Sequence, residues 1–425
     1  MNKPLLWRSP SFRNVTTLVS GTAVAQVINL FSTPLLTRIY SPDEYAVFQL
    51  FYSLATSLAV LATLRYELAI VNPDNEEETN DLITICFYST LVISVLSLLL
   101  VIGWHASLVQ LGPFDYWYYL IPVYVFFAGL VQTMNYLSTR LGTFRRNMFG
   151  RIATSISTAL VAIGAGYAGL RPAGLLISAG IGQLTGFMVL YRSMSGLMVR
   201  PFRPGNTVKE TLRKYKKYPL FNGPHALLDV VQDNAIIFLI GAYFQFSMVA
   251  FFGQAMRILK APFNFIGTAI FQVIYPKFNE FANEGKDLRP YLMRFYVQLG
   301  LIGFPFFAAL FFYGAPTFSW LLGSEWEEAG RIASILSPWL YLNFLSSPFS
   351  CMALIRNRQD IAMGFTVLNA VLRTGAVIAG GLLQDATMAL AMMSVAGTFV
   401  FIALLTWYYS LGAPSYGIGD YQRRT

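Results

Sequence analysis

The sequence is poor in charged residues. Only 12% of its 425 residues are Asp, Glu, Lys or Arg, whereas 55% are hydrophobic, and the mean hydropathy is +0.53. A soluble domain usually carries about a quarter charged residues. The composition therefore excludes an ordinary soluble protein and favours a chain that lies mainly in a lipid bilayer.

Residues and motifs that carry chemistry are also scarce. The two cysteines, Cys86 and Cys351, stand in apolar stretches, which excludes a disulfide framework and a thiolate metal cluster. There is no GxxxxGK(S/T), HExxH or CxxC motif, so nothing indicates ATP hydrolysis or a metal centre. We expect no cofactor, no metal and no nucleic-acid partner.

Two glycine patterns are better explained by helix packing than by ligand binding. Gly164, Gly166 and Gly169 match GxGxxG, but no strand precedes them, so we reject a dinucleotide site. Gly182 and Gly186 form a GxxxG pair, which is common in membrane helices. We predict that all five lie where helices approach closely.

Long apolar runs recur from end to end of the chain. An α-helix of about 20 apolar residues crosses a bilayer with its backbone hydrogen bonds satisfied. Windows of this kind predict spans at 14–36, 45–71, 81–104, 116–138, 148–170, 173–191, 219–243, 246–274, 291–313, 328–352, 360–382 and 386–410. The predicted fold class is therefore all-α integral membrane, with about twelve transmembrane helices.

A basic stretch divides the predicted spans into two groups of six. It predicts an N-terminal six-helix lobe at 1–191, a cytoplasmic linker at 192–218 and a C-terminal six-helix lobe at 219–425. If the amino terminus lies inside, most of the 30 Lys and Arg residues fall in cytoplasmic segments. Because such segments collect Lys and Arg, we predict that both termini are cytoplasmic.

Two charged segments near this face have more than one interpretation. The loop 72–80 is acidic, and the spacing of Asp74 and Glu77 resembles a capping box at the start of the third span. The basic segment 209–218 either lies on anionic lipid headgroups or acts only as a topology signal.

Ionisable residues inside the predicted spans are the most informative, because each costs roughly 2.5–3.5 kcal/mol at mid-bilayer and usually faces a cavity or a partner. Four lie near the middle of their spans: Asp229, Asp233, Arg257 and Arg373. Three lie nearer the ends: Arg65, Glu67 and Lys260. On a helix Arg65 and Glu67 would point to different faces, and the alternative for Arg65 is that it extends to the cytoplasmic interface.

Helical spacing gathers polar residues into stripes that run over several turns. The stripe in span 219–243 consists of Asn222, His225, Asp229, Gln232 and Asp233. Span 14–36 contributes Thr22, Gln26, Asn29 and Thr33, and span 246–274 contributes Gln254, Arg257, Asn264, Thr268 and Gln272. Such stripes predict a hydrated internal cavity. The alternatives are that Arg257 or Arg373 pairs with Asp229 or Asp233 to lock helices together, and that His225 is a packing residue.

Four segments carry a resemblance to a known family. They are 35–51 (LLTRIYSPDEYAVFQLF), 63–78 (TLRYELAIVNPDNEEE), 218–229 (YPLFNGPHALLD) and 254–278 (QAMRILKAPFNFIGTAIFQVIYPKF). They resemble the lipid-linked oligosaccharide flippases of polysaccharide biosynthesis, such as O-antigen flippases, in the multidrug/oligosaccharidyl-lipid/polysaccharide exporter superfamily. That fold has two six-helix bundles around a cavity that opens alternately to either side.

The resemblance implies a flippase, not an enzyme, in a bacterial inner membrane. It would move an undecaprenyl-diphosphate-linked oligosaccharide from the cytoplasmic to the outer leaflet during surface polysaccharide biosynthesis, for example of lipopolysaccharide O-antigen. Arg65, Arg257 and Lys260 would engage the diphosphate and sugars, whereas Arg373 joins this set only from its predicted depth. Expected partners are the substrate, membrane lipids and a polysaccharide polymerase or ligase.

The remaining polar residues are expected to serve the same cavity. Its neutral lining is predicted to include Gln26, Asn29, Asn222, His225 and Asn264. The candidates for coupling to an ion or to the membrane potential are Glu67, Asp229 and Asp233.

Two other functions stay open. A proton- or sodium-coupled multidrug exporter of the same fold needs acidic cavity residues; Asp229 and Asp233 supply two, although the first span has none. A membrane polysaccharide polymerase or ligase is expected to expose a sizeable outer loop with reactive residues, and the predicted outer loops are short.

Overall fold

The computed structural model describes residues 10–73, 75–106, 115–194 and 207–414, which form helices and no strand. They divide into two compact units, Met1–Ala235 and Ile236–Thr425. The predicted all-α fold class is confirmed. The assignment of six spans to each lobe stays a prediction.

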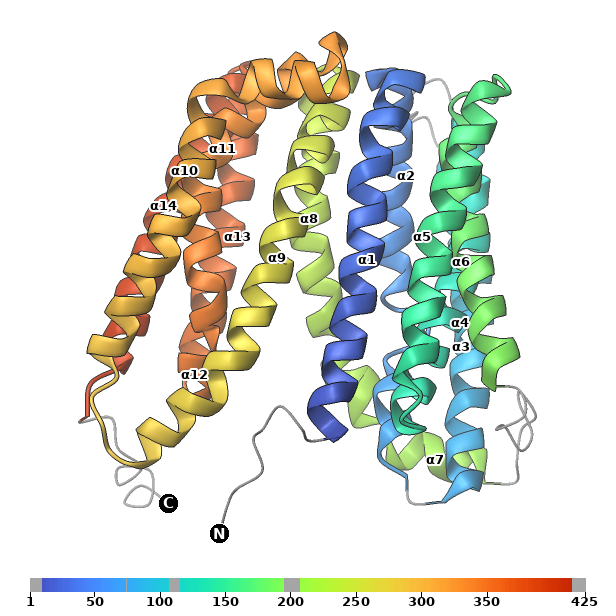
Figure 1. The fold of residues 1–425 in the computed structure, drawn as a ribbon. Helices are drawn as coiled ribbons and strands as arrows, with labels where there is room; N and C mark the ends of the chain where they lie inside the picture. The colour runs from blue at the N-terminus through green and yellow to red at the C-terminus, as the bar shows by residue number, and fades with distance from the viewer. Residues whose placement is uncertain (1–9, 74, 107–114, 195–206, 415–425) are drawn as a thin grey trace. The chain divides into compact units, whose positions relative to one another are not determined.

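The first unit contains the long helices α1 to α6, the linker helix α7 and most of α8 (Figure 1). Its short elements are the 3₁₀ helices η2 (Tyr66–Val71) and η3 (Asp115–Leu120) and the π-helical turn η5 (Tyr218–Asn222). The α-helices are α1 (Pro10–Ile39), α2 (Pro42–Ala59), α3 (Glu76–His105), α4 (Ile121–Arg140), α5 (Phe144–Tyr167), α6 (Ala173–Met194), α7 (Val208–Lys214) and α8 (Gly223–Tyr243).

The second unit begins within α8 and ends with α14. Its short elements are η6 (Ser324–Trp326) and η7 (Ser347–Ser350). Its α-helices are α9 (Phe246–Asn283), α10 (Arg289–Leu322), α11 (Glu327–Ser346), α12 (Cys351–Ile355), α13 (Gln359–Leu382) and α14 (Ala386–Leu411).

Seven described helices are long and apolar enough to cross a membrane: Glu76–His105, Tyr116–Arg140, Phe144–Tyr167, Ala173–Met194, Arg289–Leu322, Gln359–Leu382 and Ala386–Leu411. α3 also has the polarity of a lipid-exposed helix. It buries Thr90 and Ser97, whereas Val95 and Leu99 are 50% and 57% exposed. An apolar surface over a small, polar interior is typical of membrane helices. The protein is therefore a multi-pass membrane protein.

Glycines set the contact between α5 and α6, which lie side by side (Figure 1). A Cβ atom at Gly182 would collide with Oγ1 of Thr158, and one at Gly186 with Oγ1 of Thr154. The packing role predicted for this GxxxG pair is confirmed.

The GxGxxG glycines behave differently from one another. Gly166 packs against Ile39 at the end of α1, as predicted. The prediction is wrong for the other two. Among the described residues, no atom from outside its own stretch of helix lies within 4 Å of a Cβ built at Gly164, and Gly169 adopts φ +79° in the turn after α5. Glycine readily takes this left-handed conformation.

α11 is at the centre of the second unit and packs on α9, α10 and α14. Trp326 of η6 and Trp339 of α11, at 0% and 1% exposed, are among the largest buried side chains of this unit. Gly314 of α10 and Gly330 of α11 allow the two backbones to touch. α10 kinks at Tyr313 (φ −124°, ψ 18°), three residues before Pro316, as expected for a helix interrupted by proline.

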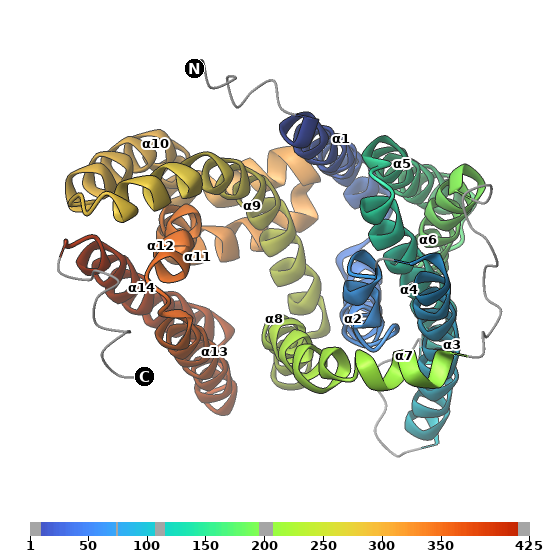
Figure 2. The same ribbon diagram turned by 90° about the horizontal axis from the view of Figure 1, so that it is seen from below.

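The linker helix α7 docks on the end of α3 (Figure 2). The hydroxyls of Thr207 and Thr211 donate to Oδ2 of Asp81, the second at 3.3 Å, and Asp81 is 1% exposed. Lys214 Nζ lies 2.5 Å from Oε1 of Glu78, and this hydrogen bond raises the pKa of Lys214. Neither earlier interpretation of the basic segment anticipated this contact, in which the acidic residues at the start of α3 hold the linker.

The capping box predicted at Asp74 and Glu77 is wrong in its register. The N-cap of α3 is Asn75, whose side chain accepts from the backbone N–H of Glu78 at 2.8 Å. Asp74 lies outside the described residues. Asn and Asp are about equally favoured at this position, so the sequence alone does not show whether Asp74 or Asn75 is the N-cap.

Candidate functional site

The second predicted span, 45–71, is not one helix. α2 ends at Ala59, and the chain then turns through Leu64 (φ 49°) and Arg65 (φ 64°) before η2 begins at Tyr66. A left-handed backbone costs a residue other than glycine roughly 1–2 kcal/mol and tends to persist at functional sites. No glycine or proline lies at the break, so no local pattern in the sequence predicts it.

The break brings Arg65 and Glu67 together. Arg65 Nη1 lies 3.3 Å from Oε1 of Glu67, and the Glu67 side chain is 0% exposed. Gln132 of α4 donates to Oε1 at 2.7 Å, and the Thr63 hydroxyl donates to Oε2. The expectation that Arg65 and Glu67 point to different faces is therefore wrong, because it assumed a continuous helix.

Arg65 keeps unused hydrogen-bonding capacity. Its side chain is 20% exposed, and its Nε is buried with no acceptor within the described part of the chain. A buried donor without a partner is costly unless a ligand or water satisfies it. η2 itself is fixed, because Arg140 at the end of α4 donates to the carbonyl oxygens of Pro73 and Ile70, at 2.5 and 3.3 Å. The site is thus a partly exposed cation on a rigid support.

α1 contributes part of its predicted polar stripe to a surface. Gln26 is exposed and Asn29 half-buried, so both are available to a ligand. Thr33 is buried, and its hydroxyl donates to the Asn29 carbonyl at 2.7 Å, so it does not line a cavity. Thr22 accepts a hydrogen bond of 3.2 Å from Nη1 of Arg151.

Arg151 is a residue that the sequence analysis missed. Its place near the cytoplasmic end of the predicted span 148–170 resembles a topology signal, but the structure places it at the eighth residue of α5. The available signal was the four-residue spacing from Asn147, which puts the two side chains on one face. Arg151 Nε does donate to Oδ1 of Asn147, at 3.0 Å.

The predicted residues of α8 are only partly described. Asn222 is exposed and belongs to η5, just before the helix. The side chains of His225, Asp229 and Asp233 lie outside the described residues. Asn234, which was not predicted, donates to the Ser53 carbonyl at 3.0 Å and to the Ser57 hydroxyl at 2.9 Å, and so ties α8 to α2.

α9 carries two of the predicted cations. Arg257 is exposed and Lys260 is half-buried. The Asn264 side chain lies outside the described residues. Gln254 is 2% exposed, and neither its amide nitrogen nor its oxygen has a partner in the described part of the chain.

Arg373 of α13 is the least accessible predicted cation, at 5% exposed. Its Cζ lies 4.4 Å from the centre of the Trp339 ring, which is a cation–π contact. Because Trp339 is itself buried, this arrangement joins α13 to α11. A substrate would have to displace packed side chains to reach Arg373.

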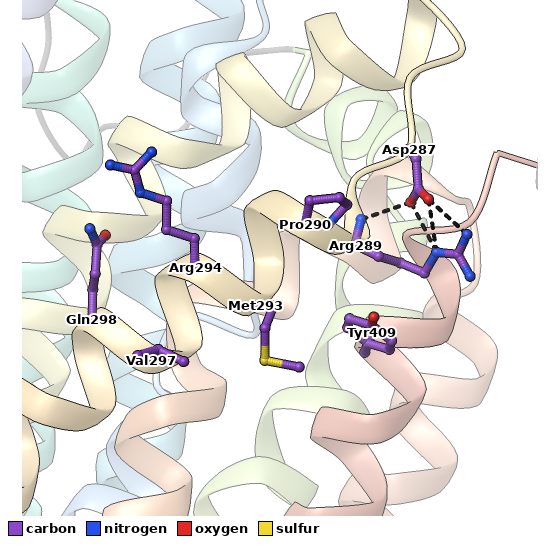
Figure 3. Close-up of a pocket in the computed structure, with 8 residues that line it drawn as sticks. All are labelled: Asp287, Arg289, Pro290, Met293, Arg294, Val297, Gln298 and Tyr409. Carbon is purple, nitrogen blue, oxygen red and sulfur yellow. Dashed lines mark hydrogen bonds and ion pairs between the residues drawn. The ribbon is translucent and has the colours of Figure 1, made fainter.

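A separate surface pocket of about 630 Å³ lies at the start of α10 (Figure 3). Asp287 and Arg289 face each other across 2.7 Å, and the Arg289 guanidinium lowers the pKa of Asp287, whereas Arg294 extends away from this pair. None of the predicted site residues lines this pocket. Within the described residues, no three His, Cys, Asp or Glu side chains gather as metal ligands.

Comparison with known proteins gives one family and several solved structures. The family described as polysaccharide biosynthesis protein matches residues 35–331. No curated protein matches the chain.

Among solved structures, the chain is similar to the lipid II flippase MurJ in an inward closed conformation, with a TM-score of 0.72, 12% identity, and 92% of this chain and 87% of that chain covered. It is similar to an inward-facing multidrug resistance transporter of the MATE family, with a TM-score of 0.65, 15% identity, and 92% and 95% covered. A transporter from Pyrococcus furiosus gives a TM-score of 0.59 and 15% identity, with 96% and 97% covered. The last two belong to the MOP superfamily, so the chain has the fold of these transporters.

Proposed function

The chain belongs to the polysaccharide biosynthesis protein family, and we propose that it is a flippase for a lipid-linked oligosaccharide. The substrate is an undecaprenyl-diphosphate oligosaccharide, which passes from the cytoplasmic to the outer leaflet by alternating access. The observation that carries the proposal is Arg65, whose partly exposed guanidinium has a buried Nε without an acceptor.

A diphosphate cannot cross hydrocarbon unaided, because charge in the bilayer is costly. It needs cations presented along a shielded path, and arginine can hold phosphate oxygens with two parallel hydrogen bonds. Arg65 has this chemistry, and its carboxylate partner Glu67 limits the net charge of the empty site. We propose that Arg257 and Lys260 bind the same substrate, because both lie on α9 and neither is fully buried. Arg373 takes part only if its contact with Trp339 opens.

Glu67 is the coupling residue in this proposal. Its carboxylate accepts hydrogen bonds from Thr63 and Gln132 and pairs with Arg65. Protonation of Glu67 would remove the charge that holds Arg65 and would leave the guanidinium for the diphosphate. Asp229 and Asp233 remain proposed coupling residues, and Gln26, Asn29, Asn222, His225 and Asn264 remain proposed sugar contacts.

The setting follows from the substrate. We propose that the protein lies in a bacterial inner membrane with both termini cytoplasmic, where undecaprenyl-linked saccharides are assembled. It would serve a surface polysaccharide such as the O-antigen of lipopolysaccharide, beside the polymerase or ligase that consumes its product.

The test is translocation in liposomes. Purified protein is reconstituted with a fluorescent polyprenyl-diphosphate oligosaccharide, and the label that reaches the opposite leaflet is measured for the wild type, Arg257→Ala and Arg294→Ala. Arg294 is the matched control, because it is an exposed arginine in the pocket of Figure 3. We expect transport by the wild type and Arg294→Ala and little by Arg257→Ala. Equal transport by all three would contradict a cationic path through Arg257.

A multidrug exporter is the second candidate, because the chain has the fold of a multidrug resistance transporter. The same liposomes distinguish the two functions. Proton-driven export of a cationic dye, without movement of the diphosphate lipid, would favour the exporter. A polymerase or ligase would instead lengthen or transfer the saccharide, which chromatography of the labelled product would detect.

A further inference from the structure

Arg151 is a membrane-embedded cation with neutral partners. It is the eighth residue of α5 (Phe144–Tyr167), so it lies about 10 Å along the helix from Phe144. Its Nε donates to Asn147 at 3.0 Å and its Nη1 to Thr22 at 3.2 Å. No carboxylate pairs with it in the described part of the chain.

The charge of Arg151 therefore lacks compensation. An arginine side chain stays protonated and offers five N–H donors, of which these two contacts occupy two. Asn147 and Thr22 orient the guanidinium but do not neutralise it. Because a cation within a membrane span is costly, it is usually kept for a partner of opposite charge. Because its described protein partners are neutral, the expected partner is an anionic ligand.

Arg151 is connected to the Arg65 site through α4. Asn147, which is 2% exposed, donates to the backbone carbonyl of Asn135 at 3.4 Å, and Gln132 donates to Glu67 at 2.7 Å. Gln132 and Asn135 are one turn apart on α4, a rise of about 4.5 Å. Both arginines therefore lie beside the same stretch of one helix.

A second observation points to a ligand with hydroxyl groups. Oδ1 of Asn135 is buried and has no donor among the described residues. A sugar hydroxyl next to a bound phosphate would supply the missing donor.

We propose that Arg151 is a second anion-binding residue, which holds the diphosphate of the lipid-linked substrate together with Arg65. This inference rests on the proposed function. α5 runs antiparallel to α4, and Arg151 lies four residues, a rise of about 6 Å, beyond Asn147 along α5. Arg151 is therefore near the level of Gln132, the residue that binds Glu67.

Arg151 could instead serve only to clamp α1 to α5. Arg151→Gln removes the charge but keeps a side-chain donor for Thr22 or Asn147. Thr22→Val removes the contact with α1 and keeps the charge. If Arg151 only clamps α1 to α5, the two variants should lose similar affinity for the diphosphate. If Arg151 binds the anion, Arg151→Gln should lose more affinity than Thr22→Val.

The experiment measures binding of farnesyl diphosphate by isothermal titration calorimetry in an uncharged detergent. We expect Arg151→Gln to weaken binding about tenfold or more, as for a lost charge-assisted contact, and Arg151→Lys to weaken it less. Thr22→Val, which keeps the charge, should weaken binding less than Arg151→Gln does. Arg145→Gln is the matched control, because Arg145 is an exposed arginine on the same helix, and it should stay near the wild type. Melting temperatures measured without ligand show whether each variant is folded.

Several results would overturn the inference. One is unchanged affinity in folded Arg151→Gln, and another is an equal loss in Thr22→Val together with a lower melting temperature. A third is that phosphatidylglycerol nanodiscs stabilise the wild type but not Arg151→Gln, and that farnesyl diphosphate does not compete with this effect. That result would assign Arg151 to a bilayer headgroup instead. If the wild type itself ignores farnesyl diphosphate, the proposed function fails as well.

Discussion

The guanidinium of Arg65 lies 3.3 Å from the carboxylate of Glu67, and the left-handed backbone at Arg65 makes this contact possible. Side chains two residues apart on a regular helix do not face each other. The break after α2 therefore creates the candidate site, and Gln132 of α4 completes it. If the strained backbone turn holds Arg65 in place, changes to the ion pair and to the turn should both alter the free energy of unfolding.

The ion pair should be coupled energetically. Glu67→Gln leaves Arg65 without its counter-charge, so we expect a lower free energy of unfolding. The double variant Arg65→Gln/Glu67→Gln should recover part of the loss, with a coupling energy of about 1–3 kcal/mol. Chemical unfolding in detergent micelles measures all four proteins.

The exposed pair of Arg331 and Glu327 is the control for this cycle, with nitrogen and oxygen 2.8 Å apart. Its coupling should stay below about 1 kcal/mol, because solvent screens surface pairs. A coupling energy for Arg65 and Glu67 no larger than that of the control would show that burial does not strengthen this ion pair.

The backbone turn should be relieved by glycine. Leu64 adopts φ 49° and is 37% exposed, so Leu64→Gly removes backbone strain but also some packing. We expect its free energy of unfolding to stay about 1 kcal/mol or more above that of Leu61→Gly. Leu61→Gly, three residues earlier, should lower it. If both variants lower it equally, position 64 is not strained.

The sequence predicted the helices better than their interruptions. Long apolar runs located the helices, because a membrane span must satisfy its own backbone in one continuous element. Most predicted spans coincide with a long helix. Span 328–352 continues past α11 through η7 into α12, and in span 45–71 the helix α2 ends at Ala59. The turn there depends on tertiary contacts of Glu67 with α4, which no local pattern encodes. The family and the exporter fold inferred from sequence resemblance are confirmed.

The linker helix should depend on Asp81. Asp81→Ala leaves the hydroxyls of Thr207 and Thr211 without their acceptor, so we expect a loss of about 1–3 kcal/mol and faster tryptic cleavage at 209–217. Glu78→Gln is the control. It removes only the pair with Lys214, whose side chain is 61% exposed, and should have little effect. Unchanged cleavage in Asp81→Ala would show that other contacts hold α7.

The contact of α5 with α6 should not tolerate a larger side chain. Gly186→Val places methyl groups against Thr154, and we expect a loss of about 1–3 kcal/mol in the free energy of unfolding. Gly164→Ala has open space around its new methyl group and should be neutral or slightly stabilising, because alanine favours a helix. Thermal unfolding in detergent separates the two, and equal melting temperatures would contradict the packing described.

The candidate site was less predictable than the fold. Arg65 and Glu67 stood out because charge is rare in membrane spans, but their contact needed the backbone turn. Arg151 was missed because a basic residue near a span end looks like a topology signal. Arg373 was singled out by depth, yet depth does not separate a cavity residue from one packed on Trp339. The substrate roles of all these residues stay predictions.

Flippase activity is measured as the initial rate at which reconstituted protein exposes a labelled polyprenyl-diphosphate oligosaccharide on the opposite leaflet. The wild type is compared with folded Arg65→Gln and with protein-free liposomes. We predict a rate for the wild type well above that of empty liposomes, and a rate for Arg65→Gln lower by about tenfold or more, as for a lost charge-assisted contact. A wild-type rate equal to that of empty liposomes, in vesicles that still export a cationic dye, would contradict the proposed flippase function.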